Sequence, residues 1–141
     1  MKAALCVMAA LLALGGSADA ADQTFPEQDG QVLFTTPSGN IGCVYTPEGG
    51  APHYQPADGG PELQCDRVEP TYLRFILSRN AAPTHVGNVG DQGCCSAGNT
   101  LHYGSSWNAG PFTCESARIG LTCNRDDGHG FFISRAKTDV Y

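Results

Sequence analysis

The stretch that decides the fold is FTCESARIGLTCNRDDGHGFFISR, residues 112–135. Short apolar runs with alternating polar positions predict strands at 112–115, 119–124 and 131–135. Asp127 and Gly128 form a strong tight-turn pair, because glycine adopts positive φ without steric cost, so the last two strands should form a hairpin. Cys114 and Cys123 share a face with the apolar residues of their strands, which favours buried structural bridges over reactive thiols.

Similar short strands precede this stretch. The pattern predicts them at 32–35, 41–45, 63–68, 71–77 and 101–103. Residues 71–77 fit either a strand or two helical turns, and their aromatic and β-branched content favours a strand. No stretch keeps a 3.6-residue period, so we expect an all-β fold: a small disulfide-stapled sandwich or barrel of about seven to eight short antiparallel strands.

The sequence predicts loops in two segments between these strands. Residues 47–61 are crowded with proline and glycine, which predicts the longest exposed loop of the fold. Residues 85–99 are rich in glycine and should be irregular.

Residues 1–20 have the pattern of a cleaved signal peptide. Lys2 supplies a positive start, an apolar run follows, and Ala18 and Ala20 fit the A-x-A cleavage motif. We therefore expect export to the periplasm or the extracellular space, a flexible arm over residues 21–31, and a single β-rich domain over residues 32–141. No later apolar stretch approaches membrane-spanning length, so we expect no membrane span.

Loss of this leader would remove Cys6 and leave an even number of cysteines in an oxidising compartment, so three disulfides are the default. The six are Cys43, Cys65, Cys94, Cys95, Cys114 and Cys123. Strand alternation favours Cys43 with Cys65 and Cys114 with Cys123, each joining neighbouring strands. Cys94 and Cys95 would then pair with each other. In the alternative, Cys94 and Cys95 each form a disulfide with a different cysteine, for example Cys95 with Cys43.

Composition narrows the function classes. The chain has 14 acidic and 8 basic residues and a net charge of −6, which argues against nucleic acid or an anionic membrane as partner. The four histidines lack zinc-ligand spacing, and the chain has no G-x-S-x-G elbow, no C-x-x-C and no phosphate-cradling glycine loop. We therefore expect no metal and no cofactor, and a binding protein rather than an enzyme.

Several motifs together resemble a family of small secreted bacterial proteins of unknown function. FTTPSGNIGC at residues 34–43 is similar to the opening F-x-S-P-S-G-N-I-x-C of that family. The family pattern continues at Cys65-Asp66-Arg67, at LHYG (101–104), at FTC (112–114), at GLTCN (120–124) and at GHGFFISR (128–135). The resemblance spans residues 32–141 and implies export, disulfides and a β-rich fold, with no catalytic residues to carry over. The family has one cysteine where this chain has Cys94-Cys95.

Two clusters are candidate sites. Residues 124–129 are the densest polar cluster, in which Asp127 and His129 would form an acid–base pair or a cation site, and a solvated hairpin turn is the alternative. Tyr103, Trp107 and Phe112 lie in or beside an expected turn at 104–110, where an aromatic ring could stack on a sugar or anchor a protein. The alternative there is a tryptophan that folds back to cap the end of the sandwich.

These observations predict an exported, non-enzymatic binding module of the bacterial cell envelope, whose partner is a protein or a glycan. One alternative is an inhibitor of a cell-wall hydrolase such as a lysozyme, in which the acidic chain opposes a basic enzyme and the 104–110 turn enters its cleft. A second is a small enzyme that uses His129 and Asp127, joined by His102 or Asp66. A third is a redox sensor at Cys94-Cys95. The sequence does not specify the ligand or the oligomeric state.

Overall fold

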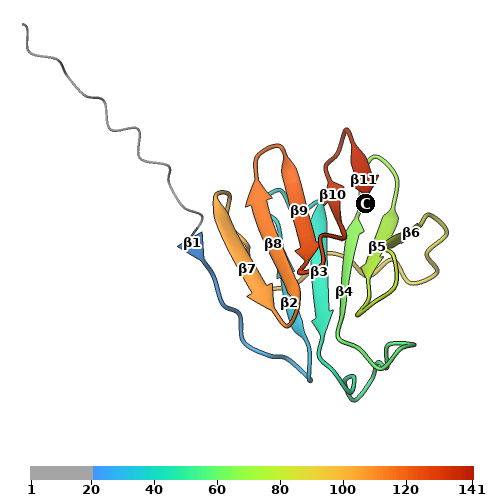
Figure 1. Ribbon diagram of the computed structural model, residues 1–141. Coiled ribbons are helices and arrows are strands. Elements are labelled where there is room, and N and C mark those ends of the chain that lie inside the picture. Colours follow the sequence, from blue (N-terminus) through green and yellow to red (C-terminus); the bar gives the residue numbers. More distant parts are fainter. Residues whose placement is uncertain (1–20) are drawn as a thin grey trace, which may run out of the picture.

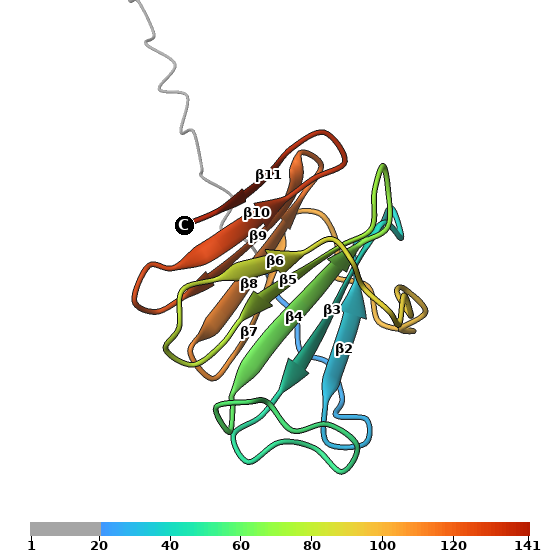
Figure 2. The same ribbon diagram turned by 90° about the vertical axis from the view of Figure 1, so that its right-hand side faces the viewer.

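The computed structural model describes residues 21–141, and the predicted signal peptide lies outside the described residues. One sheet contains β1 (Ala21–Asp22), β7 (Ser105–Ala109), β8 (Phe112–Ala117), β9 (Gly120–Arg125), β10 (Gly130–Ile133) and β11 (Thr138–Val140), in that spatial order. The other contains β2 (Val32–Thr35), β3 (Ile41–Thr46), β4 (Glu62–Arg67), β5 (Leu73–Leu77) and β6 (Thr84–Val86). The two sheets pack face to face (Figures 1 and 2), which confirms the predicted all-β fold as an open sandwich.

The neighbouring strands are antiparallel, apart from the parallel pair of β1 and β7. Alternation along each strand determines which side chains face the core. In β8 the side chains are alternately buried and exposed along the whole strand. The predicted hairpin of β9 and β10 is present, and Gly128 in its turn has a φ of 91°. Over residues 21–141 the structure contains no helix long and apolar enough to cross a membrane.

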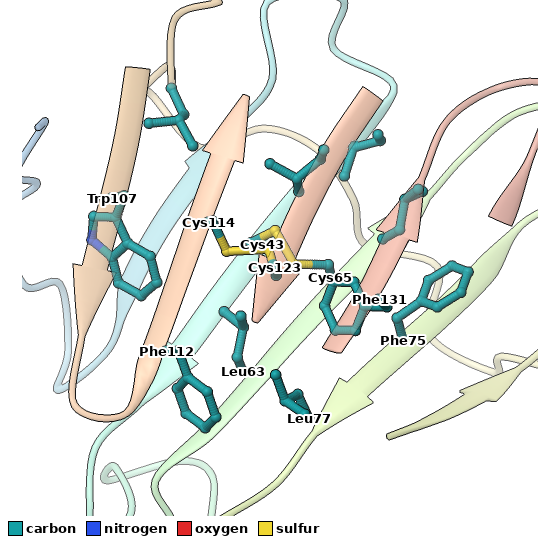
Figure 3. Packing of buried hydrophobic residues seen from close by; sticks show 14 of the residues in the cluster. Cys43, Leu63, Cys65, Phe75, Leu77, Trp107, Phe112, Cys114, Cys123 and Phe131 are labelled. Carbon is teal, nitrogen blue, oxygen red and sulfur yellow. A yellow bond between two sulfur atoms is a disulfide. The ribbon is translucent and has the colours of Figure 1, made fainter. Parts of the chain in front are cut away.

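The core between the sheets is built from aromatic rings around two disulfides (Figure 3). Cys43–Cys65 joins directly paired residues of β3 and β4, and Cys114–Cys123 does the same for β8 and β9, with Cα atoms 4.1 Å apart in each. Both are the pairs that alternation favours. With sequence separations of 22 and 9, the chain-entropy relation gives about 3.4 and about 2.6 kcal/mol of stabilisation.

These two bridges face each other across the core. The sulfur atoms of Cys43, Cys65 and Cys123 lie within 4.8 Å of one another, and all three side chains are buried. Because each sulfur is bonded in a disulfide, the cluster offers no thiolate to a metal ion.

One predicted strand and one predicted turn are wrong. The strand expected at 101–103 is absent; Leu101 is buried and its N–H bonds to Thr35 of β2. The expected turn at 104–110 is instead the strand β7, in which Trp107 points into the core between polar neighbours. Its serine and asparagine content hides the strand pattern, and the tertiary contacts of one tryptophan outweigh that weak propensity.

Residues 21–31, which we expect to form a flexible arm, pack along the sandwich. Ala21 and Asp22 form β1 beside β7, and the Phe25 ring stacks on Phe34 at 5.6 Å between centroids. The Gln23 amide donates to Thr100 O and accepts from the His102 N–H. The apolar ring of Phe25 gives a polar segment its anchor.

Candidate functional site

Asp127 and His129 hold the turn of the β9–β10 hairpin. The Asp127 carboxylate forms an ion pair with Arg125, with 2.7 Å between Oδ2 and Nη2, and accepts the His129 backbone N–H at 3.2 Å. The Arg125 guanidinium lowers the pKa of Asp127 to about 2. The His129 ring contacts a different group, with Nδ1 3.1 Å from the carbonyl oxygen of Tyr141. These bonds hold the hairpin turn in place. An acid–base role for the two residues stays a prediction.

The buried side chain of Arg125 connects this turn to the other sheet. Its side chain is only 1% exposed, and its Nη1 donates to the carbonyl oxygens of Ser78 and Ala81 at 2.6 and 2.8 Å. These carbonyls belong to the connection after β5 in the other sheet, so Arg125 fastens the two sheets together. Asp127 neutralises a charge that would otherwise be buried at a cost of several kcal/mol.

The two predicted aromatic residues have separate environments. Trp107 is 2% exposed and its ring packs against Phe34 and Tyr45, at 5.0 and 5.6 Å between centroids. Trp107 is therefore a core residue of β7, and a buried indole offers no free face to a ligand. Tyr103 is 37% exposed, and the Arg118 guanidinium lies 5.1 Å from its ring centroid. A binding role for Tyr103 stays a prediction.

The strongest candidate site is a groove on the outer face of the five-stranded sheet. Two hollows of about 220 Å³ each lie side by side along this face. Both are lined by Val44, Gln64, Arg74 and Asp91, so they form one continuous groove. We call these two hollows the groove.

A polar network crosses the floor of the groove. In the sheet register Gly42 pairs with Asp66, and Asp66 pairs with Arg74, so the three lie in one row across β3, β4 and β5. Arg74 donates to both carboxylate oxygens of Asp66, each bond at 2.8 Å, and this pairing raises the pKa of Arg74. The Tyr72 hydroxyl donates to Asp66 at 2.5 Å. Burial and this hydrogen bond raise the pKa of Tyr72, so the phenol keeps its proton.

Residues 91–99 form an arch over one end of this floor, and we use that name below. At one end Arg74 donates to the Asp91 carboxylate at 2.9 Å and to its carbonyl at 3.1 Å. At the other end the Asn99 amide donates to Leu33 O at 2.8 Å, and Thr35 N–H donates to Asn99 O at 2.9 Å. Figure 2 shows this segment, coloured yellow to orange, curling beside β2. Bonds at both ends therefore hold an irregular segment across the outer face of the sheet.

Cys94 and Cys95 form the third disulfide, in the middle of the arch. Their sulfur atoms lie over Gly42, where a Cβ atom would come within 2.7 Å of Cys94 Sγ and 2.9 Å of Cys95 Sγ. The Cys94 backbone N–H donates to the Tyr72 hydroxyl at 3.2 Å. Gly42 is therefore the position that lets the paired sulfurs rest on the sheet. Both residues are half-buried, unlike the four core cysteines, and the redox-sensor hypothesis stays a prediction.

The far end of the groove has a second carboxylate. Glu62 is 6% exposed and accepts the Tyr54 hydroxyl at 2.6 Å. Burial and this bond raise the pKa of Tyr54 to about 12. Between the two carboxylate ends lies Gln64, half-buried, whose amide has no hydrogen-bond partner within the described residues. The groove thus offers a free amide at its centre and acceptor groups on both sides.

No family model, curated protein or solved structure matches this chain. The resemblance to a secreted family stays an expectation. Function is therefore inferred below from the groove itself.

The sequence contains one signal for the groove that the strand predictions left unused. Glu62, Gln64 and Asp66 alternate with the buried Leu63 and Cys65, so one face of β4 is apolar and the other is polar and able to bond a ligand. The contributions of Arg74 and the arch depend on contacts between distant segments.

Proposed function

We propose that the protein is an exported, non-enzymatic module of the bacterial cell envelope that binds a neutral glycan chain in the groove. The observation that carries the proposal is the unpartnered amide of Gln64 at the junction of the two hollows. A polar group that faces an open groove can exchange its bonds to solvent for bonds to a ligand, and here no protein group competes for the amide. Both donor and acceptor sites of an amide are satisfied by hydroxyl groups, which also donate and accept.

The charge of the groove favours a neutral ligand. Its lining contains three carboxylates, on Glu62, Asp66 and Asp91, and one arginine, Arg74. Asp66 and Asp91 both accept bonds from that arginine, so the groove has no free cation for an anionic ligand. Carboxylates and amides remain as acceptors for hydroxyl protons.

The shape of the groove favours a chain over a single small molecule. Each hollow, at about 220 Å³, is below the roughly 300–1,000 Å³ of pockets that enclose a drug-sized ligand. A ligand that fills both must be extended along the sheet. Leu33, Val44 and the Cys94–Cys95 sulfurs supply an apolar surface for the C–H face of a sugar ring. Export is supported by the three disulfides, which form in oxidising compartments.

The test is binding of the mature chain to purified peptidoglycan sacculi by co-sedimentation, and to soluble oligomers of N-acetylglucosamine by calorimetry. Gln64→Ala should weaken binding about tenfold, the effect of losing one to two hydrogen bonds in a half-buried site. Thr113→Ala, an exposed position on the outer face of the other sheet, is the matched control and should bind like the parent. Absence of binding to both probes, or equal binding by Gln64→Ala, would overturn the proposal.

A further inference from the structure

The positive charges of this acidic chain are distributed unevenly. Four of the arginines from 21 to 141 are committed to partners within the fold: Arg67, Arg74, Arg79 and Arg125. Arg118 and Arg135 lie instead beside the β8–β9 turn and after β10. Figure 1 shows these two ends of the strands together at the top of the sandwich. Arg135 is paired with Glu69, so the positive charge that stays unpaired at this end of the sandwich includes that of Arg118.

A pocket of about 190 Å³ lies between these arginines. Its polar lining consists of hydroxyl, amide and guanidinium groups, from Thr36, Ser38, Asn40, Tyr103, Arg118, Ser134 and Arg135. No aspartate or glutamate is among the lining residues. The wall of this pocket therefore contains no carboxylate, and the carboxylate that bonds one of its residues is that of Glu69, which pairs with Arg135.

The Arg118 guanidinium is held against an aromatic ring, and its charge has no ion-pair partner among the described residues. Its guanidinium lies over the Tyr103 ring at 5.1 Å from the centroid, a contact that orients the planar group without using its N–H donors. Arg118 forms no ion pair with a described residue. Its bidentate donor edge is therefore free for an oxyanion.

The Arg135 guanidinium is also available to a bound anion. It is paired with Glu69, but the two side chains are 65% and 60% exposed. Such exposed pairs contribute little free energy, so a bound anion can compete with the glutamate for the guanidinium. The Ser134 hydroxyl in the same wall already donates to Lys137 O at 3.0 Å, so the two guanidinium groups are the donors on which the site depends.

We propose that this pocket binds an oxyanion of the phosphate class, held by Arg118 with Arg135. The site is separate from the groove and its proposed glycan. A tetrahedral phosphate group presents several acceptor oxygens, which suits two guanidinium groups. Ile119, 78% exposed at the tip of the β8–β9 turn, is an apolar residue on the rim of the same pocket. The phosphate group could therefore come from a free ester or from the headgroup of an anionic lipid.

The test uses inorganic phosphate and glycerol phosphate in NMR titrations, and vesicles with and without phosphatidylglycerol in co-sedimentation. Arg118→Gln should weaken binding of the phosphate probe about tenfold, as expected for a charge-assisted hydrogen bond. Arg79→Gln, which removes the same charge from an exposed arginine paired with Glu48, is the matched control and should change binding less than twofold. Arg135→Gln is the second variant if Arg118→Gln perturbs the fold.

Ile119→Ser distinguishes the two sources. Loss of vesicle binding with glycerol phosphate binding retained identifies a lipid headgroup, since only a membrane would bury the isoleucine. Binding of glycerol phosphate without any binding to vesicles identifies a free ester. Both results support the pocket. The proposal is overturned if no phosphate probe and no phosphatidylglycerol vesicle binds, or if both arginine variants bind as Arg79→Gln does.

Discussion

Gly42→Ala should destabilise the protein by displacing the arch. The added Cβ would lie 2.7 Å from Cys94 Sγ, 2.9 Å from Cys95 Sγ and 3.1 Å from Cys95 Cβ. Contacts below 3.0 Å are essentially never made by real Cβ atoms. The sulfurs are bonded to each other, so neither can rotate away alone, and the arch must lift from the sheet.

The magnitude follows from two opposing effects. Overpacking of a well-packed site costs about 1–3 kcal/mol. Alanine in place of glycine in a strand recovers about 0.5–1 kcal/mol of conformational free energy. The midpoints of the two ranges give a net loss of about 1 kcal/mol in the free energy of unfolding, and a fall in Tm of roughly 3–5 °C for a domain of this size.

The assay is urea unfolding together with hydrogen exchange of the Cys94 amide, which donates to the Tyr72 hydroxyl in the intact arch. A lifted arch breaks this bond, so exchange at Cys94 should speed up in Gly42→Ala. Gly93→Ala is the matched control, because no heavy atom lies within 4 Å of the added Cβ there. It should stay within about 0.5 kcal/mol of the parent.

A double-mutant cycle isolates the cause. In a background with Cys94→Ala and Cys95→Ala, the two nearest atoms are gone, and most of the cost of Gly42→Ala should disappear. The reasoning is refuted if Gly42→Ala is neutral in the parent, or if it costs as much without the sulfurs as with them.

Three further predictions concern single side chains. Asp127→Asn should lower stability at pH 7 by more than Asp126→Asn, and the gap to the parent should close as pH falls from 3.8 through about 2, because the depressed pKa beside Arg125 contributes stability only while the carboxylate is ionised. Tyr54→Phe should lack a loss of stability that the parent shows between pH 10 and about 12, since a raised pKa contributes stability only while the phenol is protonated. Trp107→Ala should cost about 3–5 kcal/mol in denaturant unfolding.

The fold was predictable wherever the pattern is local. The hairpin at 119–135 and the two core disulfides follow from alternation within a few residues and from one Asp-Gly turn, and the strand at 71–77 follows from its aromatic and β-branched content. The predictions fail where a long-range contact determines the structure. The strand β7 depends on the burial of Trp107, and β1 depends on an edge offered by β7, which is distant in sequence.

The candidate site was less predictable than the fold. The sequence suggests Asp66 as a partner for His129 and as part of the Cys65-Asp66-Arg67 motif, whereas the structure surrounds its carboxylate with Arg74 and Tyr72. Eight residues separate Asp66 from Arg74, but the sheet register places them side by side. The arch is even more distant in sequence from the strands that it covers, since Cys94 lies over Gly42, 52 positions earlier in the chain. Register and loop closure determine such a site, and no local period encodes them.

The network under the arch is better explained by positioning than by stability. The core between the sheets already contains the large aromatic residues and two disulfides. A largely buried ion pair such as Asp66–Arg74 contributes little net free energy, because desolvation offsets most of the attraction, and packed apolar residues would serve stability as well. What apolar residues would not supply is directed hydrogen bonding to Asp91 and, through Tyr72, to the Cys94 amide. The polar row therefore fixes where the arch stands above the sheet, and with it the shape of the groove that we propose as the binding site.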